Sequence, residues 1–159
     1  MRRVRELVAV FRRRDEGGAT AVEFALVMLP LLYLVFGIIQ YGLYFYAAQS
    51  GTHAAGDAVR RIVVGDCKNE STELKPFLHT RLGSASTTSA ANIDVTQVFK
   101  DASNASVVTP VVGGSVTLTI TFDAINMHFP FIPLPNSGEV ERTVHGRIED
   151  TTATSNGCV

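Results

Sequence analysis

The chain opens with a charged head and then becomes apolar over a membrane-length run. No Asp, Glu, Lys or Arg occurs from Phe24 to Gly56, and the most apolar part is residues 24–46. At ~1.5 Å per residue this part spans roughly 35 Å, which is enough for a hydrocarbon core of ~30 Å with some tilt. We therefore predict a transmembrane span at about 24–46, inside a long N-terminal helix over 19–65.

Alternation of apolar and polar residues takes over after this helix. It predicts strands near 93–98, 114–123 and 139–149, and a short helix within Glu73–Leu82. Each predicted strand has one apolar face, which favours an antiparallel sheet covered on one side. The fold class is therefore α+β and membrane-anchored: a long N-terminal helix packed on a small antiparallel β-sheet, with 66–159 as a β-rich domain.

Charge is distributed unevenly along the chain, although the formal net charge is only −1. Arginines dominate residues 1–18, whereas acidic residues outnumber basic ones after Phe24. The positive-inside rule then places the N-terminus in the cytoplasm and the β-rich domain outside the membrane. No basic stripe lies outside the head, so nucleic-acid binding has no electrostatic support.

The head allows more than one interpretation. Val4, Leu7, Val8 and Phe11 follow helical spacing, so the head is either a basic amphipathic helix on an anionic leaflet or a disordered charged leader. A secretory signal fits poorly because the apolar run is too long and no A-x-A site follows it. A plain uncleaved anchor remains the other alternative.

Residues 18–24 read Gly-Ala-Thr-Ala-Val-Glu-Phe, with an acid near the start of the apolar run. A charged side chain there costs a few kcal/mol, which marks Glu23 as functional. Gly18, four residues, Glu23 and then Phe24 resemble the prepilin processing motif. Residues 16–46 together resemble TadE-like minor pilins (pseudopilins) of the tight-adherence (Tad/Flp) branch of type IV pilus systems.

The resemblance implies a pilin-like fold and a bacterial pilus-assembly function that supports surface adherence and biofilm formation. It implies cleavage by a prepilin peptidase between Gly18 and Ala19, which removes residues 1–18 as a leader peptide. Glu23 and Phe24 then belong to the processing and assembly motif. The implied partners are that peptidase, other Tad pilins, inner-membrane assembly proteins and the lipid bilayer. The implied location is the cytoplasmic (inner) membrane, which the chain crosses once. The resemblance also allows incorporation into the pilus.

Cleavage would expose a cationic α-amine on Ala19, one helical turn from Glu23. An amine buried among packed apolar helices is tolerated when it is paired, so Glu23 of the same or a neighbouring chain can accept it. The alternative is that Glu23 only reaches the cytoplasmic interface. Pro30 lies inside the apolar run and predicts a helix bend or a looser turn.

Two further features bear on the outer domain. Cys67 and Cys158 lie outside the membrane in this topology, where a disulfide would persist and would close a long loop; two free thiols are the alternative. The segment 126–136 holds three prolines and several large apolar residues, so it is a loop. We favour packing of those residues on their own domain over a patch for a partner.

Catalytic and cofactor motifs are not found in the sequence. The histidines are scattered, no HExxH or metal-type Cys/His spacing occurs, and no phosphate loop is present. We expect neither enzymatic activity nor a cofactor. The alternative function is a single-pass anchored envelope protein with an outer binding or scaffold domain.

Overall fold

The computed structural model describes residues 2–65 and 70–151, with backbone alone for 2–17, 70 and 71. The chain divides into two compact units, Met1–Ile39 and Gln40–Val159. Each unit is described by itself below. Cys67 and Cys158 lie outside the described residues, so the predicted disulfide stays a prediction.

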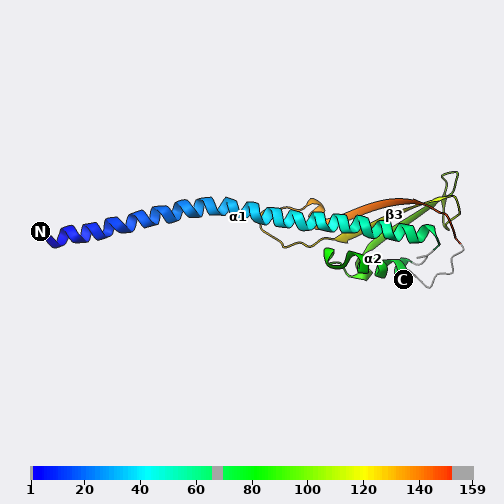
Figure 1. The fold of residues 1–159 in the computed structure, drawn as a ribbon, viewed down its shortest axis with the longest axis horizontal. Helices are drawn as coiled ribbons and strands as arrows, with labels where there is room; N and C mark the ends of the chain where they lie inside the picture. The colour runs from blue at the N-terminus through cyan, green and yellow to red at the C-terminus, as the bar shows by residue number, and fades with distance from the viewer. Residues whose placement is uncertain (1, 66–69, 152–159) are drawn as a thin grey trace. The chain divides into compact units, whose positions relative to one another are not determined.

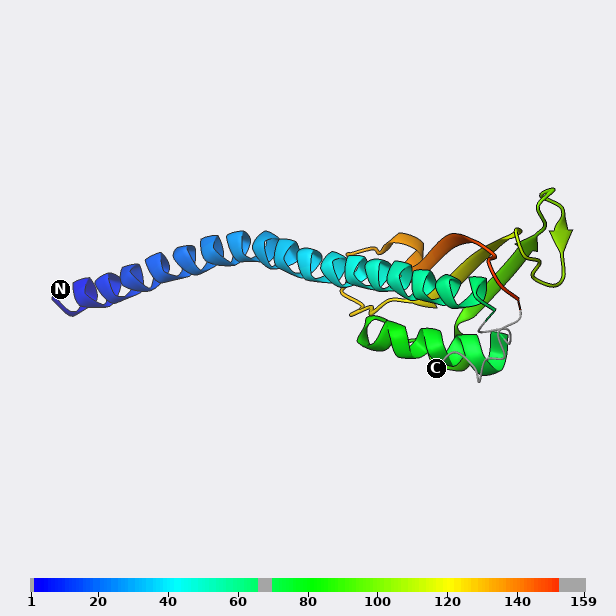
Figure 2. The same ribbon diagram turned by 45° about the vertical axis from the view of Figure 1, so that its right-hand side comes forward.

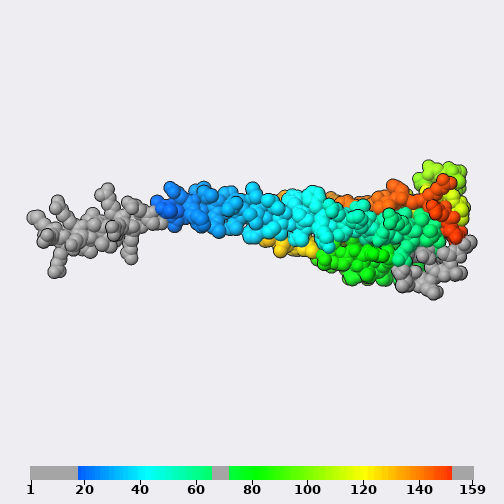
Figure 3. Space-filling model, in the orientation of Figure 1, coloured from blue at the N-terminus to red at the C-terminus, as the bar shows by residue number. Residues whose placement is uncertain are grey.

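Helix α1 extends from Arg2 to Val63 and includes Pro30 (Figure 1). In the first unit, the described side chains from Gly18 to Ile39 are exposed apart from a half-buried Gly37. Large apolar groups are among them: Leu29 is 70 % exposed and Ile38 is 65 % exposed. Figure 3 shows this segment uncovered on the face that it displays. A helix apolar on all sides and uncovered by its own chain is typical of a lipid or subunit environment.

The second unit contains an antiparallel sheet with strand order β2-β1-β3-β4. Its strands are β1 Asp94–Lys100, β2 Ser106–Val107, β3 Ser115–Asp123 and β4 Glu139–Arg147. The predicted antiparallel α+β architecture is confirmed. In β3 every second residue is buried, as its alternation predicts. The two-residue β2 was not predicted, because it is too short to show a period.

One face of the sheet forms the core with α1 and with α2, Lys75–Leu82. The opposite face is polar and carries cross-strand hydrogen bonds, such as Thr119 Oγ1 to Thr143 Oγ1 at 2.9 Å. From α1, the core takes mainly small side chains. The buried residues of α1 are Gln40, Ala47, Ala48, Gly51, Ala54, Ala55, Ala58, Val59 and Ile62.

Two glycines allow α1 and the sheet to approach closely. A Cβ on Gly51 of α1 would lie 2.7 Å from the ring of Phe122 on β3. A Cβ on Gly146 of β4 would meet Val59, and would lie 2.8 Å from Val63 on α1. Contacts this short are not tolerated, so each glycine provides the space that a large side chain of the facing element fills.

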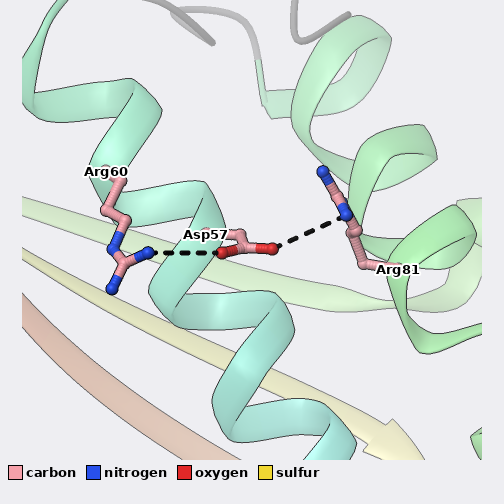
Figure 4. Close-up of polar contacts among 3 residues, drawn as sticks. All are labelled: Asp57, Arg60 and Arg81. Atoms are coloured by element: carbon pink, nitrogen blue, oxygen red, sulfur yellow. Dashed lines mark ion pairs between the residues drawn. The ribbon is translucent and has the colours of Figure 1, made fainter.

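Helix α2 lies beside the second half of α1 (Figures 1 and 2). Asp57 of α1 links the two helices: its carboxylate is 3.7 Å from Arg81 of α2 and 4.0 Å from Arg60 (Figure 4). These groups are substantially exposed, so the ion pairs contribute little to stability. The buried Phe77 ring contributes more, and Arg61 and Arg81 lie over it at 5.0 and 5.2 Å.

The ends of the elements differ slightly from the sequence expectations. Helix α1 ends at Val63, and Gly65 follows at a φ of 90°, a conformation that glycine adopts without strain. The predicted short helix is found as α2, preceded by a π-helical turn, Glu70–Leu74, that no sequence period indicates. The backbone N–H groups of Glu149 and Asp150 donate to the Val63 carbonyl, which closes the end of α1.

We predict that Gly146→Ala destabilises the outer unit. The added methyl group would force Val59 and Val63 away from β4, and overpacking of this kind costs about 1–3 kcal/mol. Thermal unfolding of the full chain in detergent, followed by circular dichroism, should show a lower midpoint.

Gly56→Ala is the control, because a Cβ there meets nothing within 4 Å. It should raise the midpoint, since alanine favours a helix over glycine by about 1 kcal/mol. An unchanged midpoint for Gly146→Ala would contradict the close approach.

Candidate functional site

The predicted processing segment lies in the exposed part of α1. Gly18, Ala19 and the residues up to Phe24 are helical, and all of them are exposed. A Cβ on Gly18 would have nothing within 4 Å, so this glycine is not required by packing within the described chain. The fold therefore gives no packing reason for a glycine at this position.

Glu23 is the one charged residue between Gly18 and Ile39. Its side chain is exposed on the same stretch as Val22 at 65 % and Phe24 at 66 %. Ala19, whose amine would become the new terminus, precedes it by one helical turn. The neighbours of Glu23 along the helix are thus exposed apolar side chains of the kind that face lipid. In such surroundings a carboxylate needs a cationic partner or water.

Gln40 is a second polar residue of the apolar run, and it is buried whereas Glu23 is exposed. It is 1 % exposed and lies at the start of the second unit. Its amide nitrogen donates to the Ile125 carbonyl at 3.2 Å, and its oxygen accepts from the Met127 N–H at 3.0 Å. Sequence analysis assigned it no role; the signal was a lone amide in an otherwise apolar stretch.

The same end of the second unit carries the segment 126–136, which we call the apolar loop. The Tyr41 hydroxyl donates to the Pro133 carbonyl at 2.8 Å, so two adjacent residues of α1 hold this loop. The preference for packing within its own domain is wrong for Phe131, which is 87 % exposed. Phe129, Ile132 and Leu134 are half-buried. The loop therefore presents apolar surface.

Other polar clusters of the second unit have structural explanations. Asp101 accepts hydrogen bonds from the Ser103 hydroxyl at 2.7 Å and the Ala105 N–H at 2.9 Å, which closes the turn between β1 and β2. The Ser103 hydroxyl, followed by the Ala105 amide, lowers the pKa of this exposed carboxyl below its ordinary value. Within 2–65 and 70–151, no three His, Cys, Asp or Glu side chains gather to hold a metal ion.

These features define a class of protein. One helix near the N-terminus is long and apolar enough to cross a membrane, which fits a single-pass membrane protein with a small α+β unit. Residues 18–60 match the model of the TadE-like protein family, so this part of the chain is a TadE-like segment. It supports involvement in a Tad pilus, and the family is one of pilus components rather than of enzymes. No curated protein and no solved structure matched the chain.

The match covers the first unit from Gly18 and most of the part of α1 that enters the core, but neither the buried Ile62 nor the sheet. It includes both Glu23 and Gln40. The cleavage position, the role of Glu23, the bend at Pro30 and the bridge of Cys67 to Cys158 remain predictions.

We predict that Gln40→Leu loosens the apolar loop. The Ile125 carbonyl and the Met127 N–H would lose their partner beside a buried apolar group, which costs about 1–3 kcal/mol. Hydrogen exchange of the Met127 amide in the full chain should become faster. Gln49→Leu is the matched control, because Gln49 is an exposed glutamine of the same helix and should leave exchange at Met127 unchanged. Equal exchange in both variants would show that Gln40 does not hold the loop.

Proposed function

We propose that the chain is a minor pilin, or pseudopilin, of a Tad pilus. In this proposal a prepilin peptidase cuts between Gly18 and Ala19 at the cytoplasmic face of the inner membrane. The new N-terminal segment remains in the bilayer, the second unit lies outside, and the subunit joins other Tad pilins. The observation that carries the proposal is a single carboxylate, Glu23, on the otherwise uncharged and exposed stretch 18–39 of α1, within a TadE-like segment.

The position of the span follows from where the second unit begins. Gln40 is buried in that unit, so residues 40–46 cannot face lipid on all sides. Residues 19–39 alone give roughly 32 Å of helix at ~1.5 Å per residue, which matches the hydrocarbon core. We therefore place the span at 19–39, a shift toward the N-terminus from the 24–46 of the sequence analysis.

Glu23 then lies inside the bilayer, near its cytoplasmic side. In a lone subunit the carboxylate can reach interfacial water, but among packed helices it cannot. The Ala19 amine of a neighbouring subunit is the cation that cleavage supplies at this depth. Pairing of the two charges makes assembly dependent on prior cleavage, because the partner does not exist in the precursor.

We expect Gly18→Ala to leave an uncleaved precursor. The added Cβ would obstruct the approach of the peptidase to the backbone, while nothing in the chain itself opposes it. Mass spectrometry of the membrane-extracted protein should find the intact N-terminus rather than Ala19. Gly37→Ala, equally unhindered and in the same helix, should be cut normally. Normal cleavage of Gly18→Ala would refute the site. An intact terminus in the unmodified chain would favour the anchored envelope protein.

We expect Glu23→Gln to be inserted and cut but to fail in assembly. A buried amine without its partner costs about 3–5 kcal/mol, and at 1.4 kcal/mol per tenfold this is roughly a hundredfold loss or more of incorporation. The measurement is co-purification with other pilus subunits, normalised to protein with an Ala19 terminus so that a cleavage defect is counted separately. Glu23→Asp keeps the charge and should retain part of the incorporation. Wild-type incorporation of Glu23→Gln would disprove the pairing.

A further inference from the structure

The apolar loop is hydrogen-bonded to Gln40 and Tyr41, the first two residues of the second unit. It lies between β3 and β4. Gln40 and Tyr41 hold it through hydrogen bonds to Met127 and Pro133, and Gln40 also bonds Ile125 just before it. Figures 1 and 2 both show this connection alongside α1 near the start of the second unit. Gln40 follows Ile39 directly in the chain. The loop is therefore fixed beside the point where the uncovered apolar segment ends.

The composition of the loop is that of an interfacial surface rather than a solvated turn. No Asp, Glu, Lys or Arg occurs from Ala124 to Gly138. Phe131 is 87 % exposed and Met127 is 50 % exposed. Tyrosine is enriched where a bilayer meets water, and the hydroxyl of Tyr41 is hydrogen-bonded to this loop at Pro133.

The backbone of the loop also suits that environment. Three of its residues are prolines, which carry no N–H that would need water. The His128 N–H donates to the Asn126 side chain at 2.8 Å, and the Ile132 N–H donates to the Phe129 carbonyl at 3.4 Å. Unpaired backbone groups are costly near lipid, and these donors are satisfied within the loop.

Phe131 is held outward at an energetic cost. Its φ is 67°, a left-handed conformation that is unfavourable for a bulky residue. The side chain does not pack on the core of its own unit, since it is the most exposed aromatic residue of the described chain. A strained backbone that projects a phenylalanine into water makes sense when something other than water receives the ring.

We propose that the apolar loop inserts Phe131 into the boundary between headgroups and acyl chains of the membrane that α1 spans. The inference rests on the membrane anchorage in the proposed function. With 19–39 as the span, Gln40 and Tyr41 lie at the outer interface, and the loop bonded to them lies at the same depth. A span that continued to Tyr46 would carry the loop deeper. Lipid is therefore the occupant that continuity with the span favours over a second protein.

Contact of the apolar loop with the membrane, in addition to the α1 span, has a mechanical consequence. A unit attached to a bilayer through one helix can swing about the point where the helix leaves the membrane. An inserted loop beside that point fixes the orientation of the sheet relative to the membrane plane. Extraction of the subunit into a pilus would then have to withdraw the loop from lipid.

The chain lacks tryptophan, so a single tryptophan reports on one position. The experiment uses full-length Phe131→Trp in phosphatidylcholine–phosphatidylglycerol vesicles with brominated acyl chains, which quench nearby indole rings. We expect blue-shifted emission and strong quenching. Val108→Trp is the matched control: Val108 is 95 % exposed, follows β2, and belongs to the end of the sheet remote from the apolar loop. It should emit as in water and be quenched several-fold less.

A third variant, Leu34→Trp, tests the anchorage separately, because Leu34 lies inside the proposed span. Quenching of Leu34→Trp with none of Phe131→Trp would overturn the loop proposal and leave the anchorage intact. Absence of quenching in both would overturn the anchorage itself. Blue-shifted emission of Phe131→Trp without bromine quenching, dependent on protein density in the vesicle, would assign the loop to a second copy of the chain and refute the lipid contact.

Discussion

The second unit depends on the close approach of α1 to the sheet, which its small side chains make possible. Alanines and Gly51 line the helix face, while Phe122 of β3 fills the space that Gly51 leaves. The relation is reversed at the other end of the contact, where Gly146 of β4 accepts Val59 and Val63 of α1. Such reciprocal packing fixes the position of the helix along the strands, since a shift by one residue would bring large groups together.

Because that position is fixed, the position of Gln40 is fixed as well. Its two hydrogen bonds secure the segment after β3 to the helix, and Tyr41 secures the same segment near Pro133. The apolar loop is thus a consequence of helix packing rather than an independent feature. Its charge-free composition becomes informative only once the structure shows that it lies beside the residue that ends the uncovered helix.

The main elements could be predicted from the sequence because their periods are strong. The alternation of β3 and the long apolar run each extend over enough residues to be unambiguous. The position of the second unit along the helix could not be predicted, since residues 40–46 are as free of charge as residues 24–39. Only the contacts with Ile125 and Met127 show that Gln40 belongs to the second unit. For the same reason the inferred span moves to 19–39.

The exposure of Phe131 was also beyond sequence analysis. Large apolar residues in a small domain usually cover its core, and that general expectation favoured burial. The α1 and α2 helices cover the inner face of the sheet instead, and the positive φ of Phe131 turns it away from the domain. For the candidate site, the sequence indicated Gly18 and Glu23 through their pattern. Gln40 stood out only as a lone amide in the apolar run, and that signal did not identify the backbone groups that it bonds.

Glu23 and Gln40 show how two polar residues in one apolar helix can have different explanations. Gln40 violates the apolar pattern, and its own chain compensates by burying the amide against two backbone groups. Glu23 violates the same pattern on a stretch whose described side chains are exposed, apart from a half-buried Gly37. A polar side chain whose hydrogen bonds are made within its own fold has a structural role. One that only another molecule can pair marks a functional site. In our proposal, cleavage creates the partner of Glu23, because the Ala19 amine is the cation that appears at the depth of the carboxylate.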